Sequence, residues 1–261
     1  MPPSWLSQTE TDVPAREDWL TPHERDRAAR MRYTKRRNEF LLGRWTAKRA
    51  IAQWLGHNDD APSLAAVEIR NGSDGAPFAL AHAATAPVAL SMTDRAGWAV
   101  CAVHRPEVRL GCDLELVEPR SAAFVRDYLT ASEQAVVHRA PTADERDLRA
   151  NLLWSAKESA LKVLRTGLRR DTRSVEVHLV DGATDDTWHP LQVRAEEGAV
   201  FFGWWQRFGA FLLSVVADED IPPPTSMMHP PGLASGTPTH SWTDVPLVPP
   251  GSPPGQLVLR R

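Results

Sequence analysis

Apolar residues recur at helical spacing in two long segments of the chain. The first covers residues 35–55 and ends at Gly56, a residue suited to a left-handed helix cap. The second covers residues 147–165. A shorter helix is predicted over residues 22–32, with Thr21 as its N-cap.

Short apolar segments separated by turn residues follow each long helix, and this pattern is typical of antiparallel strands. The predicted strands cover residues 65–70, 77–80, 88–91, 98–104, 108–116, 174–180, 191–195, 200–206 and 210–217. The segments 97–103 and 209–216 occupy corresponding places in the two halves, which indicates internal duplication, although any two apolar strands look alike. The predicted class is α+β with mainly antiparallel sheet.

The last 41 residues differ in composition from the rest of the chain. They hold 11 of the 22 prolines, together with many Gly, Ser and Thr residues. Such a segment buries too little apolar surface to offset the entropy lost on ordering, so residues 221–261 are predicted to be disordered. The preceding 220 residues are expected to form the folded unit, because 42% of the whole chain is hydrophobic.

Several protein classes are excluded by composition. No apolar run approaches the ~20 residues that span a bilayer, and the N-terminus lacks the pattern of a secretory signal. Cys101 and Cys112 form no metal-binding or disulfide pattern. A cytoplasmic protein without membrane contact is therefore expected.

Charged residues are unevenly distributed along the chain, although its net charge is only −3. Residues 23–50 carry ten Lys or Arg against three acids, an excess that attracts an anion such as a phosphate, a nucleic acid or an acidic protein. Lysine is rare, with four against 26 arginines, yet Lys157 and Lys162 lie within five positions of each other. This concentration distinguishes the second long helix.

Two acidic residues alternate in the segment Gly111–Leu116. Asp113 and Glu115 would point to the same face of a strand, roughly 6.6 Å apart along it. A hard cation such as Mg²⁺ would relieve their repulsion. The alternative is the solvated face of an ordinary amphipathic strand.

Three polar residues share a stripe of the second long helix: Trp154, Glu158 and Lys162 are spaced at i, i+4 and i+8. A Glu–Lys pair at this spacing is also common on exposed helix surfaces. Ser91 and Thr93 end a predicted strand, where hydroxyls hold phosphate or simply form a turn.

Taken together, these motifs resemble the 4′-phosphopantetheinyl transferase superfamily, specifically its monomeric surfactin-synthetase-activating type. The resemblance covers residues 25–217 and depends on the paired patterns G-x-D-x-E at 111–115 and W-x-x-K-E-x-x-x-K at 154–162. It implies two similar α/β halves, residues 1–104 and 105–220, related by a pseudo-twofold axis with a ligand cleft between them. It also implies transfer of phosphopantetheine from coenzyme A to a serine of an apo acyl or peptidyl carrier protein, with release of 3′,5′-ADP.

The resemblance also assigns residue roles. Asp113, Glu115 and Glu158 are expected to hold Mg²⁺, and Glu158 to accept the serine proton. Lys162 and Lys157 are expected to contact phosphate oxygens of coenzyme A, together with Ser91 and Thr93. The candidates for its 3′-phosphate are Lys35, Arg37 and Arg44. A cytoplasmic monomer that serves fatty-acid, polyketide or nonribosomal-peptide carriers is expected, and the arginines at 165, 169, 170 and 173 are expected to steer the acidic carrier.

Two positions depart from the family pattern. Met92 stands where the family commonly has His, and Ala76 stands where it often has Lys, so two phosphate contacts are missing. Arg70, Arg95 or the basic helix could compensate. A degenerate relative that binds coenzyme A or a carrier without catalysis is the main alternative. A nucleic-acid-binding protein is the second, although no binding module is recognisable.

Overall fold

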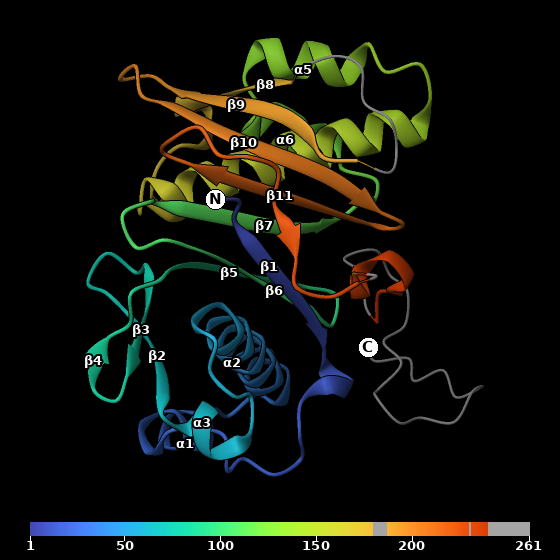
Figure 1. Cartoon of the computed structure of the whole chain (residues 1–261). Coiled ribbons are helices and arrows are strands. Elements are labelled where there is room, and N and C mark those ends of the chain that lie inside the picture. Colours follow the sequence, from blue (N-terminus) through green and yellow to red (C-terminus); the bar gives the residue numbers. More distant parts are fainter. Residues whose placement is uncertain (180–186, 230, 240–261) are drawn as a thin grey trace, which may run out of the picture.

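The computed structural model describes residues 1–179, 187–229 and 231–239, and it arranges them as two larger sheets with a long helix against each and a third, smaller sheet (Figure 1). The helices are α1 (Pro22–Ala29), α2 (Thr34–Leu55), α3 (Ala61–Ala65), α4 (Ala122–Tyr128), α5 (Ala131–His138) and α6 (Ala143–Val163). The strands are β1 (Ser4–Thr9), β2 (Val67–Asn71), β3 (Pro77–Ala81), β4 (Ala84–Thr85), β5 (Ala89–Arg95), β6 (Trp98–His104), β7 (Leu110–Leu116), β8 (Val175–Leu179), β9 (His189–Ala195), β10 (Val200–Phe208), β11 (Phe211–Ala217) and β12 (Thr225–Ser226). The mixed α+β class is as predicted. Among the described residues, no helix has both the length and the apolar character needed to cross a membrane.

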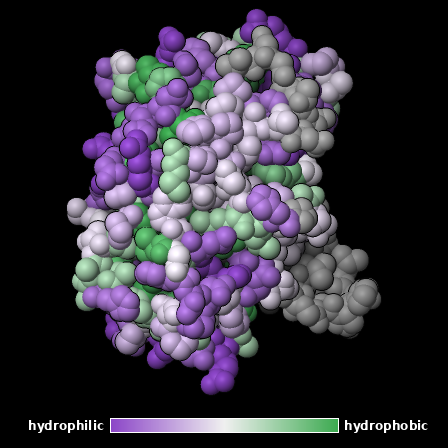
Figure 2. All heavy atoms as spheres, in the orientation of Figure 1, coloured by the Kyte–Doolittle hydropathy of each residue, from purple (hydrophilic) through white to green (hydrophobic). Residues whose placement is uncertain are grey.

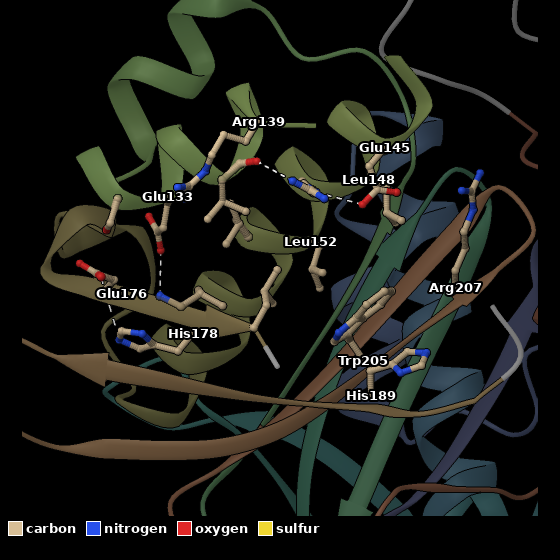
Figure 3. A pocket seen from close by; sticks show the side chains of 16 residues that line it. Glu133, Arg139, Glu145, Leu148, Leu152, Glu176, His178, His189, Trp205 and Arg207 are labelled. Atoms are coloured by element: carbon tan, nitrogen blue, oxygen red, sulfur yellow. Dashed lines mark hydrogen bonds and ion pairs between the residues drawn. The ribbon is translucent and has the colours of Figure 1, made fainter. Parts of the chain in front are cut away.

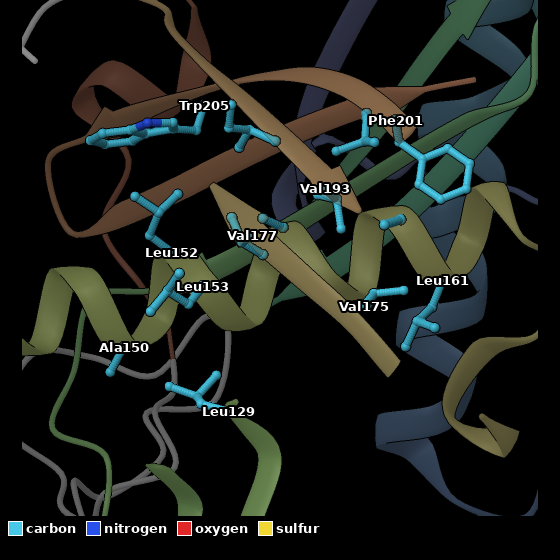
Figure 4. Packing of buried hydrophobic residues seen from close by; sticks show 14 of the residues in the cluster. Leu129, Ala150, Leu152, Leu153, Leu161, Val175, Val177, Val193, Phe201 and Trp205 are labelled. Carbon is cyan, nitrogen blue, oxygen red and sulfur yellow. The ribbon is translucent and has the colours of Figure 1, made fainter. Parts of the chain in front are cut away.

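The second half contains an antiparallel sheet in the order β7-β11-β10-β9-β8. Helix α6 packs across one face of it, because Leu152, Leu153 and Leu161 recur on the helix side that faces Val177 and Val193 (Figure 4). The helix begins where the Thr142 side chain accepts a hydrogen bond from Glu145 N. This packing fixes the face of α6 that carries the sequence motif.

The first half contains a sheet in the order β12-β1-β6-β5 and a smaller one in the order β2-β3-β4. Helix α2 lies between them in Figure 1 and buries Ala47, Ala50 and Ile51. Its end at Gly56, with φ of 68°, is as the sequence predicted. Thr21 caps α1 as expected.

The two sheets meet where β5 runs beside β7. Ser91 Oγ accepts a hydrogen bond from Cys112 N (2.9 Å), and Thr93 Oγ1 accepts one from Leu114 N (3.2 Å). Gly111 allows α6 to approach β7 on the other side, since a Cβ at this position would lie only 1.9 Å from the Ser159 carbonyl oxygen. The G-x-D-x-E segment is therefore held between a strand of the first half and the helix of the second.

A buried polar arrangement recurs in both halves. In the first half the Glu24 carboxylate pairs with Lys48 Nζ (2.5 Å) and accepts from Ile69 N (3.0 Å). In the second, Glu133 pairs with Lys157 (2.8 Å) and accepts from Val177 N (2.8 Å).

The surroundings of the two pairs are alike as well. Each glutamate completes a capping box, with Thr21 in the first half and Thr130 in the second. Trp19 meets Trp45, and Tyr128 meets Trp154, each edge to face with ring centroids 5.1 Å apart. The same helix–helix–strand unit is thus built twice.

The segment after β11 differs from the prediction of disorder. Strand β12 pairs with β1, and Leu233 is fully buried beside Trp98, whose indole N–H donates to the Thr237 carbonyl (3.1 Å). Apolar side chains of residues 221–229 and 231–239, including Ile221 and Leu233, pack in the cluster that contains Trp98 of the first sheet. Residues 240–261 lie outside the described residues.

Candidate active site

A cavity of about 470 Å³ lies where β5, β7, α2 and α6 come together. It collects the predicted Asp113, Glu115, Glu158 and Lys162, with Thr93 on the adjoining strand. The i, i+2 spacing on β7 and the i, i+4 spacing on α6 bring these groups to one place. The alternative that they form unrelated solvated faces does not hold, because Asp113 and Glu115 are buried.

Asp113 is held by two neighbours. Its Oδ1 atom accepts from Lys162 Nζ (2.9 Å) and from Thr93 Oγ1 (3.2 Å). Lys162 Nζ also donates to the Cys112 carbonyl oxygen (2.8 Å). Burial, the largest single effect, lowers the pKa of Lys162. The charges of Asp113, Cys112 and Glu158, together with the hydrogen bond to Asp113, outweigh burial and raise that pKa above its ordinary value. Lys162 is therefore a permanent cation at the cavity wall.

Glu115 is fixed by three donors. Arg95 Nε (2.8 Å) and Arg120 Nη2 (3.0 Å) contact Oε2, and the indole N–H of Trp154 donates to Oε1 (3.0 Å). Arg95 also pairs with Glu118. This explains the tryptophan of the helix motif, whose ring edge orients a carboxylate across the cavity.

Glu158 lies among like charges. Burial raises the pKa of Glu158 most, and the charges of Asp113 and Glu115 raise it further. The charge of Lys162 opposes them, and the resulting pKa is about 7. Asp94 lies at the rim of the same cavity. Desolvation by the surrounding protein, and then the charge of Glu39, raise the pKa of Asp94 to about 6. An excess of negative charge is therefore concentrated in one small volume.

The donor chemistry fits a hard cation. Asp113 Oδ2 is buried without a hydrogen-bond partner, and the pKa of Glu158 is raised because burial and two neighbouring carboxylates outweigh the charge of Lys162. Among the described residues, however, no group of three acidic, His or Cys side chains is arranged closely enough to hold a metal. Arg95, Arg120 and Trp154 hold the Glu115 carboxylate at the cavity wall, and both of its oxygens already accept hydrogen bonds.

The residues predicted for the 3′-phosphate are dispersed. Lys35 lines the cavity, but Arg37 pairs with Glu17 on another face of α2. Arg44 is buried against Glu24 and the ring of Phe40.

The remaining basic side chains of residues 23–50 are also partly engaged. Lys35 pairs with Glu39, Lys48 with Glu24 and Arg49 with Asp59, so part of the basic stretch is neutralised within the fold.

Lys157 requires a correction. Its side chain is fully buried, pairs with Glu133 and donates to the carbonyl oxygens of Thr172 (2.9 Å) and Val175. Three acceptors use the three donors of the ammonium group, so Lys157 does not face the cavity. Its role in the structure is to connect α6 with α5 and β8.

Ser91 also differs in position from the prediction. Its hydroxyl is buried and accepts from Cys112 N, so it connects the two strands. Arg95, Arg120 and Asp94 were not predicted as site residues, although Arg95 was weighed for phosphate. The sequence holds no local sign that Arg95 and Arg120 would converge on Glu115.

A second cavity, of about 540 Å³, adjoins the first and shares Met92 and Lys162 with it. Residues 74–78 of the first half form one wall and residues 162–169 of the second form another. Arg70 does not supply the missing phosphate contact, because it pairs with Glu68 outside this cavity.

A third cavity, of about 750 Å³, lies on the outer side of the second half between α5, α6 and the sheet (Figure 3). Arg149 is held there by Glu145 (2.9 Å) and by the Val136 carbonyl oxygen (3.0 Å). None of the predicted site residues lines it. On the face seen in Figure 2, hydrophobic residues form small groups among hydrophilic ones.

Comparison with known proteins bears on this site. A search of curated proteins finds no match. Among solved structures, 24 chains match, including a holo-(acyl-carrier-protein) synthase from Bacillus anthracis str. Ames in complex with CoA (3′,5′-ADP). That chain is 24% identical, with a TM-score of 0.34 over 39% of this chain and 92% of the other. The stretch that carries Asp113, Glu115, Glu158 and Lys162, residues 109–198, matches the family model of the 4′-phosphopantetheinyl transferase superfamily.

Proposed function

We propose that this chain transfers the 4′-phosphopantetheine group of coenzyme A to a serine of an apo carrier protein. The observation that supports this proposal is the convergence of Asp113, Glu115, Glu158 and Lys162 on one cavity within the family-matched stretch. In this reaction the serine oxygen forms a bond to the phosphorus next to the pantetheine arm. The bond from that phosphorus to the bridging oxygen breaks, and 3′,5′-ADP leaves.

Glu158 is the proposed proton acceptor. A pKa of about 7 lies close to the working pH, where a general base is most effective, and the residue lies at the cavity wall. Lys162 is the proposed contact to the pyrophosphate, because its ammonium group stays charged and faces the same space. Thr93 and Lys35, which line the same cavity, remain proposed phosphate contacts.

Asp113 and Glu158, with Glu115, are the proposed holders of Mg²⁺. Bound there, the ion would offset the repulsion between these carboxylates and the pyrophosphate and withdraw charge from the phosphorus. The unpartnered Asp113 Oδ2 supports this assignment. Arg95, Arg120 and Trp154 keep Glu115 oriented toward the cavity.

The repeated unit supports a pseudo-twofold arrangement of two halves, residues 1–104 and 105–220, of the surfactin-synthetase-activating type. In both halves a Thr–Glu capping box is connected to a buried lysine 24 positions after the glutamate. The lysines have the same structural task in each half, whereas the proposed metal-binding carboxylates, Asp113, Glu115 and Glu158, come from the second half alone.

The carrier is proposed to approach from the side of α4 and residues 165–173. Leu168 is exposed there, and Arg169 and Arg173 add positive charge beside it. A monomeric, cytoplasmic enzyme that serves carriers of fatty-acid, polyketide or nonribosomal-peptide synthesis remains a prediction from the sequence.

The experiment that tests the function is chromatographic detection of 3′,5′-ADP after incubation of the protein with coenzyme A, Mg²⁺ and a panel of apo carriers. Release that requires both substrates supports the transferase. Coenzyme A binding without release by any carrier supports the alternative, a relative that binds but does not transfer.

A further inference from the structure

Arg165 and Arg169 cross from the second half to the first at the 540 Å³ cavity. Arg165 Nη1 lies 3.1 Å from Asp74 Oδ2, and Arg169 Nη2 donates to the Asp74 carbonyl oxygen (3.0 Å). Both arginines and Asp74 line the cavity. The contact therefore lies at the edge of a cavity that opens between the two halves.

The walls of this cavity suit a nucleoside with phosphate groups at two positions. Pro77, Phe78 and Leu90 provide an apolar wall from the first half. The cationic side chains, Arg109, Lys162, Arg165 and Arg169, come from the second. Arginine pairs well with phosphate because its planar group donates two parallel hydrogen bonds.

The order of the cationic groups follows the chain. Lys162 lines both cavities and so stands at the boundary with the carboxylate site. Arg165 follows three positions later, just past the end of α6, with φ of 59°. This left-handed backbone is uncommon for a residue other than Gly, Asn or Asp, and it turns the chain toward the Asp74 turn.

We propose that Arg165 and Arg169 bind the 3′-phosphate of coenzyme A, and that Asp74 takes the place of this phosphate when the nucleotide is absent. The inference rests on the proposed function for the identity of the nucleotide. It replaces the assignment to α2, where Arg37 and Arg44 face other partners. It also explains how the chain compensates for Ala76, because Arg165 and Arg169 supply the positive charge from the opposite wall of the cavity.

Asp74 is a competitor that a phosphate can displace. Its side chain is 36% exposed and that of Arg165 is 49% exposed, so their ion pair contributes little stability. A phosphate monoester carries more charge than a carboxylate and offers three acceptor oxygens. Removing the Asp74 charge should therefore strengthen nucleotide binding.

The test is calorimetric titration of the full chain with 3′,5′-ADP and with 5′-AMP, which lacks the 3′-phosphate. The double variant Arg165→Gln/Arg169→Gln should lose about 10- to 100-fold in affinity for 3′,5′-ADP and less than about twofold for 5′-AMP. Asp74→Asn should bind 3′,5′-ADP more tightly than the unaltered protein. Arg173→Gln is the matched control, because Arg173 lies in the same loop, pairs with Asp171 and does not line the cavity.

An equal loss for both nucleotides, or no loss for either, would overturn the inference. The binding measurement is independent of transfer. If the arginines discriminate the 3′-phosphate but no carrier is modified, the proposed function fails and the nucleotide site stands. If transfer occurs and the arginine variants bind both nucleotides normally, the site fails and the function stands.

Discussion

The ammonium group of Lys162 on α6 lies 2.9 Å from Oδ1 of Asp113 on β7. The ion pair joins two residues that lie 49 positions apart in the chain, and it does so at the wall of the carboxylate cavity. The lysine thus offsets part of the acidic charge and still faces the space where a pyrophosphate would lie. Asp113 Oδ2 keeps no protein partner.

Replacing Lys162 by Met should lower kcat/KM for transfer by about 10²-fold or more, because one preorganised charge toward the pyrophosphate is removed. Lys162→Arg should retain more activity than Lys162→Met, since the charge remains. The measurement is the initial rate of carrier modification at several coenzyme A concentrations. Activity of Lys162→Met within twofold of the unaltered protein would contradict the role.

Glu158→Gln should abolish transfer without loss of the fold. Removing a carboxyl group whose pKa is raised to about 7 by burial and neighbouring carboxylates relieves repulsion, so the melting temperature should stay constant or rise.

A second measurement on Glu158→Gln tests metal binding without relying on activity. Mg²⁺ should raise the melting temperature of the unaltered protein, since a ligand bound to the native state stabilises it, and the rise should be smaller in the variant. Removal of Mg²⁺ with a chelator should reverse the rise. Equal shifts in both proteins would show that Glu158 is not a metal ligand.

Lys48→Met and Lys157→Met should each destabilise the fold by about 3–5 kcal/mol, because each leaves a buried glutamate without its partner. Urea unfolding measures the loss. The double variant Glu24→Gln/Lys48→Met should recover part of it, since no buried charge is then left alone. If Lys157→Met retained full stability and lost only coenzyme A affinity, its assignment as a structural residue would be wrong.

Asp94→Asn should stabilise the protein at alkaline pH but not near pH 4. Desolvation by the surrounding protein, and then the charge of Glu39, raise the pKa of Asp94 from 3.8 to about 6 in the folded chain. The folded state therefore binds this proton more tightly, and the wild-type protein loses stability as the pH rises from about 4 through 6. The effect should be small, about a degree or two in melting temperature at pH 8, because Asp94 lies at the cavity rim, where solvent screens its charge. A difference that is constant from pH 4 to 8 would contradict this account.

Local signals predicted much of the fold. The strand at 98–104 has the predicted bounds, and α2 differs by one residue, because alternation and helical spacing are set by burial against one sheet. The cap at Thr21 was also readable, since its side chain bonds to an amide three positions away. The repeat of the buried Glu–Lys pair became visible only in three dimensions.

The features that sequence reasoning missed depend on distant contacts. Strand β1 forms through pairing with β6, about 95 residues later, and its own sequence alternates poorly. Leu233 is held in place by packing beside Trp98. Arg95 and Arg120 look like ordinary surface arginines in the sequence, yet both converge on Glu115. Local composition does not indicate partners that lie this far away in the chain.

The central claim, transfer of phosphopantetheine, is tested most directly by the intact mass of an apo carrier protein after incubation with this protein, coenzyme A and Mg²⁺. The account predicts a mass increase equal to one phosphopantetheine group, its absence in a carrier with the acceptor serine replaced by alanine, and its loss with Glu158→Gln. An unchanged mass for every carrier in a panel of acyl and peptidyl carriers would contradict the claim.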